Sequence, residues 1–144
     1  MAAPETSLRL IVVSQERQLL DVVVDSVSAP STEGEITILP GHLPLFTQLQ
    51  LGILTYRQGT EAEEIVVSRG FLDVSPHNEI TVMVDTATHA REISPQQAEK
   101  AVHAAEETMK TASRDQREFI LAEASLKQAM LEMKVFQARG KRSR

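Results

Sequence analysis

The chain has no cysteine and no tryptophan, and its aromatic residues are only four phenylalanines and one tyrosine. Without cysteine, disulfides and metal sites with thiolate ligands are excluded. So few rings cannot form a stacking platform for carbohydrate or single-stranded nucleic acid. No run of about 18 apolar residues occurs, so we expect no transmembrane helix. No basic segment followed by an apolar core opens the chain, and we therefore expect a cytosolic protein.

Lysine is missing from the first two thirds of the chain. Residues 1–93 hold thirteen acidic residues and five arginines, a net charge of −8, whereas residues 94–144 hold ten basic and seven acidic residues, a net charge of +3. Such a division predicts two segments with different partners. Alternatively, the basic end is a solvated helix terminus that complements the helix dipole.

Up to about Val84 the sequence predicts short strands rich in Val, Ile and Thr and bounded by turn residues, Ala29-Pro30-Ser31 among the turns. The predicted strands are Leu8–Val13, Leu19–Val27, Glu35–Leu39, Gly52–Arg57, Glu64–Ser68, Phe71–Val74 and Glu79–Val84. Pro40 and Gly41 predict a tight reversal after one of them. This pattern is typical of an antiparallel β-sandwich or flattened barrel.

After a connector over residues 85–92, the hydrophobic period becomes helical. Ser94 is the expected N-cap, with Pro95 at the first helical position and Gln97 completing a capping box. The break near Thr111–Arg114 predicts a second helix from Asp115 to about Ala138, ended by Gly140. An antiparallel helical hairpin is the simplest arrangement, so the fold class is α+β, with a sandwich domain over residues 1–87 and a hairpin domain over residues 88–144.

The second helix carries apolar residues on two sides. One stripe is Phe119, Ala122, Leu126, Ala129, Met133 and Phe136, and the other is Ile120, Ala124, Leu131 and Val135. The first stripe can pack against the preceding helix. The second is exposed unless it meets the sandwich or a partner, and both options remain open.

The segment Gly34-Glu35-Ile36-Thr37-Ile38-Leu39-Pro40-Gly41-His42-Leu43-Pro44-Leu45 resembles the signature loop of the epsilon subunit of bacterial F-type ATP synthases. Leu43 stands where that pattern usually has Ala. The segment Ser68-Arg69-Gly70-Phe71 resembles a second family motif, with Arg69 in place of the first of two glycines. The order and spacing of these motifs extend the resemblance over nearly the whole chain.

The resemblance implies a non-catalytic rotor subunit that couples ion translocation to ATP synthesis, peripheral to the cytoplasmic face of the bacterial inner membrane and without a cofactor. The implied partners are the gamma subunit, the c-subunit ring and the beta subunits. Glu33, Glu35 and His42 become candidates to face the c ring and gamma, or else they are ordinary turn residues. The hairpin is expected to restrain ATP hydrolysis by binding the beta subunits through basic residues of its second helix: Lys127, Lys134, Arg139, Lys141 and Arg142.

Some family members bind ATP through an Asp and an Arg at the start of the first helix, where this chain has Ser94 and Gln97. Without these charges we expect nucleotide binding to be weak or absent. Two other classes of function remain alternatives. Asp21, Asp25 and Asp73 could serve a small metal-dependent enzyme, although alternating strands place such residues in solvent anyway. A free-standing adaptor for nucleic acid is the other, although overall acidity argues against it.

Overall fold

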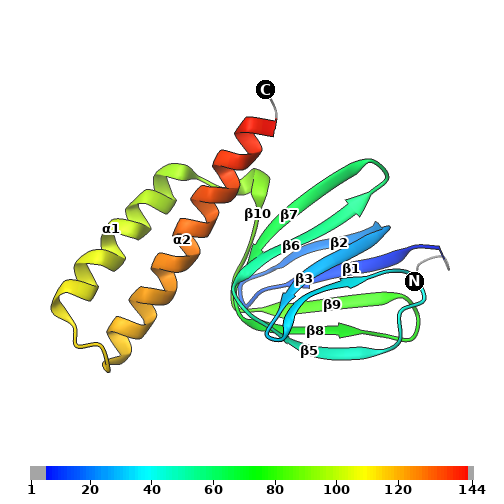
Figure 1. Ribbon diagram of the computed structural model, residues 1–144, viewed down its shortest axis with the longest axis horizontal. Coiled ribbons are helices and arrows are strands. Elements are labelled where there is room, and N and C mark those ends of the chain that lie inside the picture. The colour runs from blue at the N-terminus through cyan, green and yellow to red at the C-terminus, as the bar shows by residue number, and fades with distance from the viewer. Residues whose placement is uncertain (1–5, 143–144) are drawn as a thin grey trace. The chain divides into compact units, whose positions relative to one another are not determined.

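The structure, a computed structural model, describes residues 6–142 of the chain and the side chains of residues 6–141. It divides into two compact units, residues 1–89 and residues 90–144. The first unit is a β-sandwich and the second is a helical hairpin (Figure 1). The predicted fold class is therefore confirmed.

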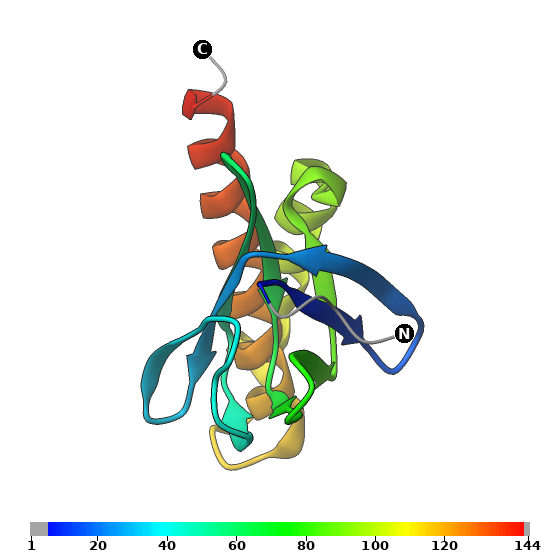
Figure 2. The ribbon, with the colours of Figure 1, turned by 90° about the vertical axis from the view of Figure 1, so that its right-hand side faces the viewer.

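The sandwich contains ten strands within the described residues. They are β1 (Leu8–Val13), β2 (Gln18–Val24), β3 (Ser26–Ser31), β4 (Gly34–Ile38), β5 (Leu45–Leu49), β6 (Gly52–Gln58), β7 (Glu61–Val67), β8 (Gly70–Val74), β9 (Glu79–Val84) and β10 (Ala87–His89). Their hydrogen-bonding order is β10-β7-β6-β3-β5-β8-β9-β1-β2, with β4 paired to β3. The pairs are antiparallel except β1 with β9, which is parallel. The hairpin of β1 and β2 is drawn in blue in Figure 2.

Alternation along the strands builds the core of the sandwich. Leu8, Leu10 and Val12 of β1 are fully buried, while the residues between them are half-buried. Inward-facing residues of the other strands complete one cluster that includes Leu54, Ile65, Leu72 and Ile80. Apolar burial is the main stabilising contribution of such a core.

The predicted turn at Ala29-Pro30-Ser31 is wrong, because these residues belong to β3. The carbonyl of Pro30 accepts a hydrogen bond from the Gln50 N–H at 3.0 Å, near the point where β3 exchanges its neighbour β6 for β5. Proline has no N–H to donate to a neighbouring strand. A strand tolerates proline where the regular pairing is interrupted, as it is here between β6 and β5.

Two strands were not predicted. β5 lies directly after Pro44, and β10 lies inside the segment predicted as a connector, followed by the 3₁₀ turn η1 (Ala90–Glu92). The single run predicted over Leu19–Val27 is divided between β2 and β3.

The hairpin consists of α1 (Pro95–Thr111) and α2 (Arg117–Arg142), which lie side by side in opposite directions (Figure 1). The predicted helix start is confirmed: the Ser94 side chain accepts a hydrogen bond from the Gln97 N–H at 3.3 Å, and Pro95 occupies the first turn. The helices approach through small buried residues, Ala98, Ala105, Ala122 and Ala129. Gly140 does not end α2, which continues to Arg142. A helical glycine costs only about 1 kcal/mol relative to alanine, too little to stop a helix by itself.

Candidate interaction surfaces

The loop between β4 and β5 contains the predicted reversal at Pro40-Gly41. The His42 N–H donates to the Leu39 carbonyl at 3.1 Å, and Gly41 adopts a φ of +86°, so proline and glycine occupy the central positions that a type II turn requires. The Gly41 N–H also donates to the Asn78 Oδ1 at 2.8 Å, which ties the loop to the turn between β8 and β9. The turn is therefore fixed from two sides, and it leaves Leu39 and Leu43 57% and 79% exposed.

The predicted residue His42 is exposed at this loop, and its ring Nδ1 lies 2.6 Å from the Leu43 carbonyl oxygen. Glu33 is exposed at the turn between β3 and β4. The hydroxyl of buried Ser31 fixes that turn, because it donates to the Gly34 carbonyl at 2.6 Å and accepts from the Glu33 N–H at 3.2 Å.

The structure does not bring the three candidates of the sandwich together. Glu33 precedes β4, Glu35 lies near its start, and His42 follows its end. The five residues of β4 span roughly 17 Å at about 3.3 Å per residue. The two glutamates and the histidine therefore lie at opposite ends of this strand.

An apolar patch on the sandwich consists of Phe46 of β5, Phe71 of β8 and Met83 of β9, which are 63%, 44% and 42% exposed. The two phenylalanine rings stack with centroids 5.4 Å apart and an interplanar angle of 19°. Phe71 and Met83 are direct cross-strand partners. The sequence analysis did not single out these residues, because Phe46 lies in an unpredicted strand. Alternation of Phe71 with the core residues Leu72 and Val74 was the one available signal.

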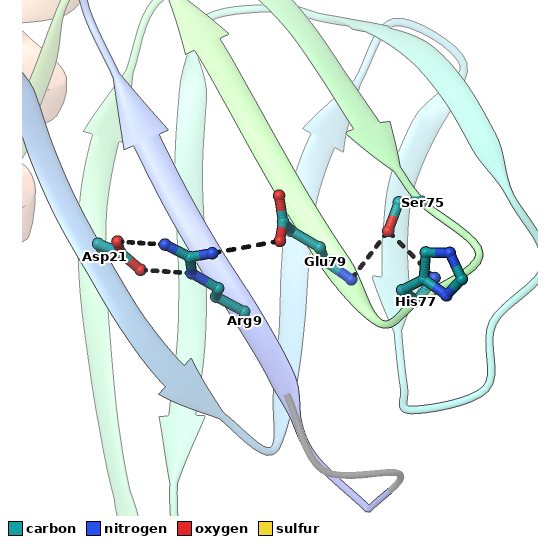
Figure 3. Close-up of polar contacts among 5 residues, drawn as sticks. All are labelled: Arg9, Asp21, Ser75, His77 and Glu79. Carbon is teal, nitrogen blue, oxygen red and sulfur yellow. Dashed lines mark hydrogen bonds and ion pairs between the residues drawn. The ribbon is translucent and has the colours of Figure 1, made fainter. Parts of the chain in front are cut away.

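Two of the three acidic residues proposed for a metal, Asp21 and Asp25, have structural partners. Asp21 accepts two hydrogen bonds from Arg9, from Nε at 2.9 Å and from Nη2 at 2.7 Å, and Arg9 Nη1 lies 3.4 Å from Glu79 (Figure 3). The hydrogen bond from Arg9 holds the pKa of Asp21 below its ordinary value. Asp25 accepts from the Gly59 N–H at 2.6 Å. Among the described residues, no group of three or more His, Cys, Asp or Glu side chains is placed to hold a metal ion.

Figure 3 also shows how the turn between β8 and β9 is held. The hydroxyl of Ser75 accepts from the N–H groups of His77 at 3.1 Å and Glu79 at 3.2 Å. Because the same turn supplies Asn78 to Gly41, it supports the loop that carries His42.

The basic residues of α2 are arranged in part as a row. Lys127, Lys134 and Lys141 are exposed and spaced by seven residues, which keeps them on one side of the helix. Lys127 pairs with Glu123 at 3.7 Å. Arg139 is half-buried and lines a hollow of about 280 Å³ together with Ala90, Arg91, Phe136 and Gly140. The side chain of the fifth candidate, Arg142, lies outside the described side chains.

The residues of the second apolar stripe of α2 differ in their exposure. Ile120 is 57% exposed, Leu131 is half-buried and Val135 is buried. Leu121 and Met130, which belong to neither predicted stripe, are 54% and 57% exposed. None of the described helices is long and apolar enough to cross a membrane.

Comparison with known families matches both units. Residues 7–90 match the family model for the β-sandwich domain of the ATP synthase delta/epsilon chain, and residues 91–137 match the model for its long α-helix domain. The ATP synthase epsilon chain of Dehalococcoides mccartyi strain BAV1 is 42% identical over 93% of this chain and 95% of its own length. That of Herpetosiphon aurantiacus is 38% identical over 94% of this chain and 98% of its own.

A structural neighbour agrees in fold. A chain in the mitochondrial ATP synthase assembly of Euglena gracilis, which contains OSCP, F1 and the c-ring, aligns with a TM-score of 0.71 at 24% identity over 88% of this chain and 79% of that chain. A β-sandwich followed by a helical hairpin defines the class. The chain belongs to the ATP synthase delta/epsilon family, and the predicted family and the predicted role as a subunit of the ATP synthase are confirmed.

Proposed function

We propose that the chain is the epsilon-type subunit of the central stalk, with no chemistry of its own, which couples the rotor of a bacterial ATP synthase and restrains ATP hydrolysis. Residues 1–87 bind gamma and the c ring, and residues 88–144 form the regulatory unit. The subunit associates peripherally with the cytoplasmic face of the membrane through the complex. Family membership and the two separate surfaces, one apolar and one basic, support this assignment.

The single observation that favours docking to another subunit is the apolar patch of Phe46, Phe71 and Met83. Burying an exposed phenylalanine side chain is favourable by about 1.5–3 kcal/mol when burial is complete. A partner that covered the stacked pair would gain this free energy. Contiguous exposed apolar patches are typical of sites where proteins interact. We assign the patch to gamma, one of the two partners proposed for the sandwich.

The patch is tested with Phe46→Ser/Phe71→Ser in binding to the assembled αβγ head. We expect at least a tenfold loss of affinity. Val23→Ser in β2 is the control, because it removes an apolar side chain that is 53% exposed from a strand that does not pair with β5 or β8. Equal affinity of the patch variant and the control would refute the assignment.

Glu33, Glu35 and His42 are proposed as contacts to the c ring or gamma, at two places along the sandwich because β4 separates them. Charge reversal at Glu33 and Glu35 is compared with reversal at Glu61 and Glu64 of β7, which lie away from that turn. Only the first pair should weaken assembly of the head onto c-ring membranes. Equal weakening by both pairs would show that only net charge matters.

The regulatory role is assigned to the hairpin because residues 94–144 carry ten of the fifteen lysines and arginines of the chain, including every lysine. ATP hydrolysis by the assembled head is measured with the full chain and with the chain ending at residue 93. We expect faster hydrolysis without residues 94–144. An unchanged rate, with binding of the truncated chain verified, would remove the regulatory part of the proposal.

Nucleotide binding is not part of the proposed function. The Ser94 hydroxyl and the Gln97 N–H are engaged with each other at the helix start, and neither side chain supplies the charge that would orient a phosphate. Calorimetry of the isolated chain with ATP should show no binding below millimolar concentration. Sub-millimolar affinity would show that other residues had replaced the family motif.

A further inference from the structure

One polar contact lies inside the sandwich next to the end of that unit. Tyr56 of β6 and His89 of β10 are each 2% exposed, and the Tyr56 hydroxyl lies 3.0 Å from the His89 Nε2. Their rings meet edge to face with centroids 6.1 Å apart. Glu63 of β7 lies 3.7 Å from the same imidazole nitrogen. His89 is the buried one of the four histidines, while the other three are exposed.

His89 lies on a short strand at the end of the first unit. β10 has three residues and pairs with one neighbour, β7, through Ala87, Thr88 and His89. β9, directly before it, has six residues and pairs on both sides, with β8 and β1. His89 is also the last residue of the first unit, since the second begins at Ala90. A short strand with one neighbour belongs to the least stable parts of a sheet.

The hydrogen bond adds a buried anchor to this strand. A buried polar group is costly to leave without a partner, so Tyr56 and His89 favour each other over separation. Two interactions therefore hold β10 in the sandwich: its three-residue pairing with β7 and the buried contact of the His89 side chain with Tyr56. If both are released, the chain leaves the sheet after Thr86, which still accepts a hydrogen bond from the Ser68 N–H at 3.0 Å and donates one to the Ser68 hydroxyl at 2.8 Å.

We propose that the Tyr56–His89 contact is a latch that sets the length of the tether between the sandwich and the hairpin. With the latch closed, the tether starts at Ala90. With the latch open, β10 leaves β7 and the tether gains residues 87–89, three residues that extend to roughly 10 Å. The latch itself is independent of the proposed function, and only its consequence for ATP hydrolysis rests on it.

The latch is tested by hydrogen exchange of the full chain, read on the segment of residues 86–91. Tyr56→Phe removes the hydroxyl and keeps the ring, so we expect exchange of this segment to become roughly ten- to hundredfold faster, as for loss of one buried hydrogen bond. Exchange in β9 should stay unchanged. Thr55→Val is the matched control, because it removes a hydroxyl from the adjacent residue of β6, for which no side-chain hydrogen bond is found among the described residues. Equal exchange in both variants would overturn the latch.

A covalent lock tests the consequence. Thr88 and Val66 are direct partners across β10 and β7, at about 5 Å between Cα atoms, within the range of a disulfide. The chain has no cysteine, so Thr88→Cys/Val66→Cys creates a single possible bridge. The proposed consequence is that the hairpin reaches the head on the longer tether, so a bridge that holds β10 on β7 prevents inhibition. We therefore expect the oxidised form to relieve inhibition of ATP hydrolysis by the head, and the reduced form to inhibit like the parent chain.

The outcomes separate the latch from the function. If truncation at residue 93 relieves inhibition but the oxidised lock inhibits fully, opening of β10 is not needed and the proposed consequence is wrong. If truncation changes nothing, the regulatory function fails, and the hydrogen exchange result still decides whether the latch exists.

Discussion

Gly70 is predicted to be the least replaceable glycine of the sandwich. It opens β8 between Leu49 of β5 and Val84 of β9. A Cβ at this position would collide with the Met83 carbonyl oxygen and lie 2.7 Å from the Val84 Cα. These atoms are backbone of a neighbouring strand, so no side-chain rotation can relieve the collision.

The magnitude follows from this geometry. Overpacking in a core typically costs 1–3 kcal/mol when side chains can move. Because β8 and β9 must separate here, we expect Gly70→Ala to cost about 3 kcal/mol or more. The midpoint of urea unfolding should then fall by roughly 1–3 M. The same separation would displace Phe71 from Met83, so binding to the head should weaken as well.

The assay uses a property of the composition. Tyr56 is the only tyrosine and tryptophan is absent, so intrinsic fluorescence reports on the sandwich alone. Gly140→Ala is the matched control, because a Cβ at this helical glycine meets no atom within 4 Å. It should stabilise α2 by up to about 1 kcal/mol and leave the tyrosine transition unchanged. A Gly70→Ala chain that unfolds at the midpoint of the parent would refute the close approach of β8 and β9.

Three further predictions concern charge and capping. The pKa of Asp21 is lower in the folded than in the unfolded chain, so the stability that Asp21 contributes is present above the unfolded pKa of about 4 and is lost as the pH falls through the folded pKa. Asp21→Asn should therefore lower the melting temperature at pH 7, and the difference from the parent should shrink below about pH 4. A difference that does not change with pH would show that the Arg9 pair is not its cause. Ser94→Ala should cost about 1 kcal/mol and speed hydrogen exchange in the first turn of α1, whereas Ser125→Ala in the exposed middle of α2 should not destabilise the hairpin; equal effects would rule out the cap. Neutralising one basic residue of α2 should change the inhibition of ATP hydrolysis little, since an exposed ion pair contributes about 0–1 kcal/mol. Neutralising all five together should relieve most of the inhibition at low salt. Full inhibition by the joint variant would refute an electrostatic contact between α2 and the head. The joint variant changes Lys127, Lys134, Arg139, Lys141 and Arg142.

Local signals in the sequence determined most elements of this protein. The bounds predicted for Leu8–Val13 and Glu79–Val84 agree with β1 and β9, because alternation and flanking turns are contained within a few residues. The turn at Pro40-Gly41 and the start of α1 at Ser94 were likewise predictable, since each depends on the conformational preference or hydrogen bond of residues close in sequence.

Errors arose where local signals were weak or misleading. β10 has only three residues and β5 directly follows Pro44, and both are stabilised by pairing with strands distant in sequence, β7 and β8. Pro30 indicated a turn by its type, but its position in the sheet removes the need for its missing N–H. Gly140 indicated a helix end, yet α2 continues through it.

The surfaces were decided only by the tertiary structure. Glu33 and His42 are near in sequence, yet an extended strand separates them, whereas Phe46 and Phe71 are distant in sequence and stack because β5 pairs with β8. Tyr56 and His89 meet in the interior for the same reason, since β6 and β10 both flank β7. Residue types and periods specify each strand, but strand order specifies which side chains share a surface, and that order is set by pairing and burial over the whole chain.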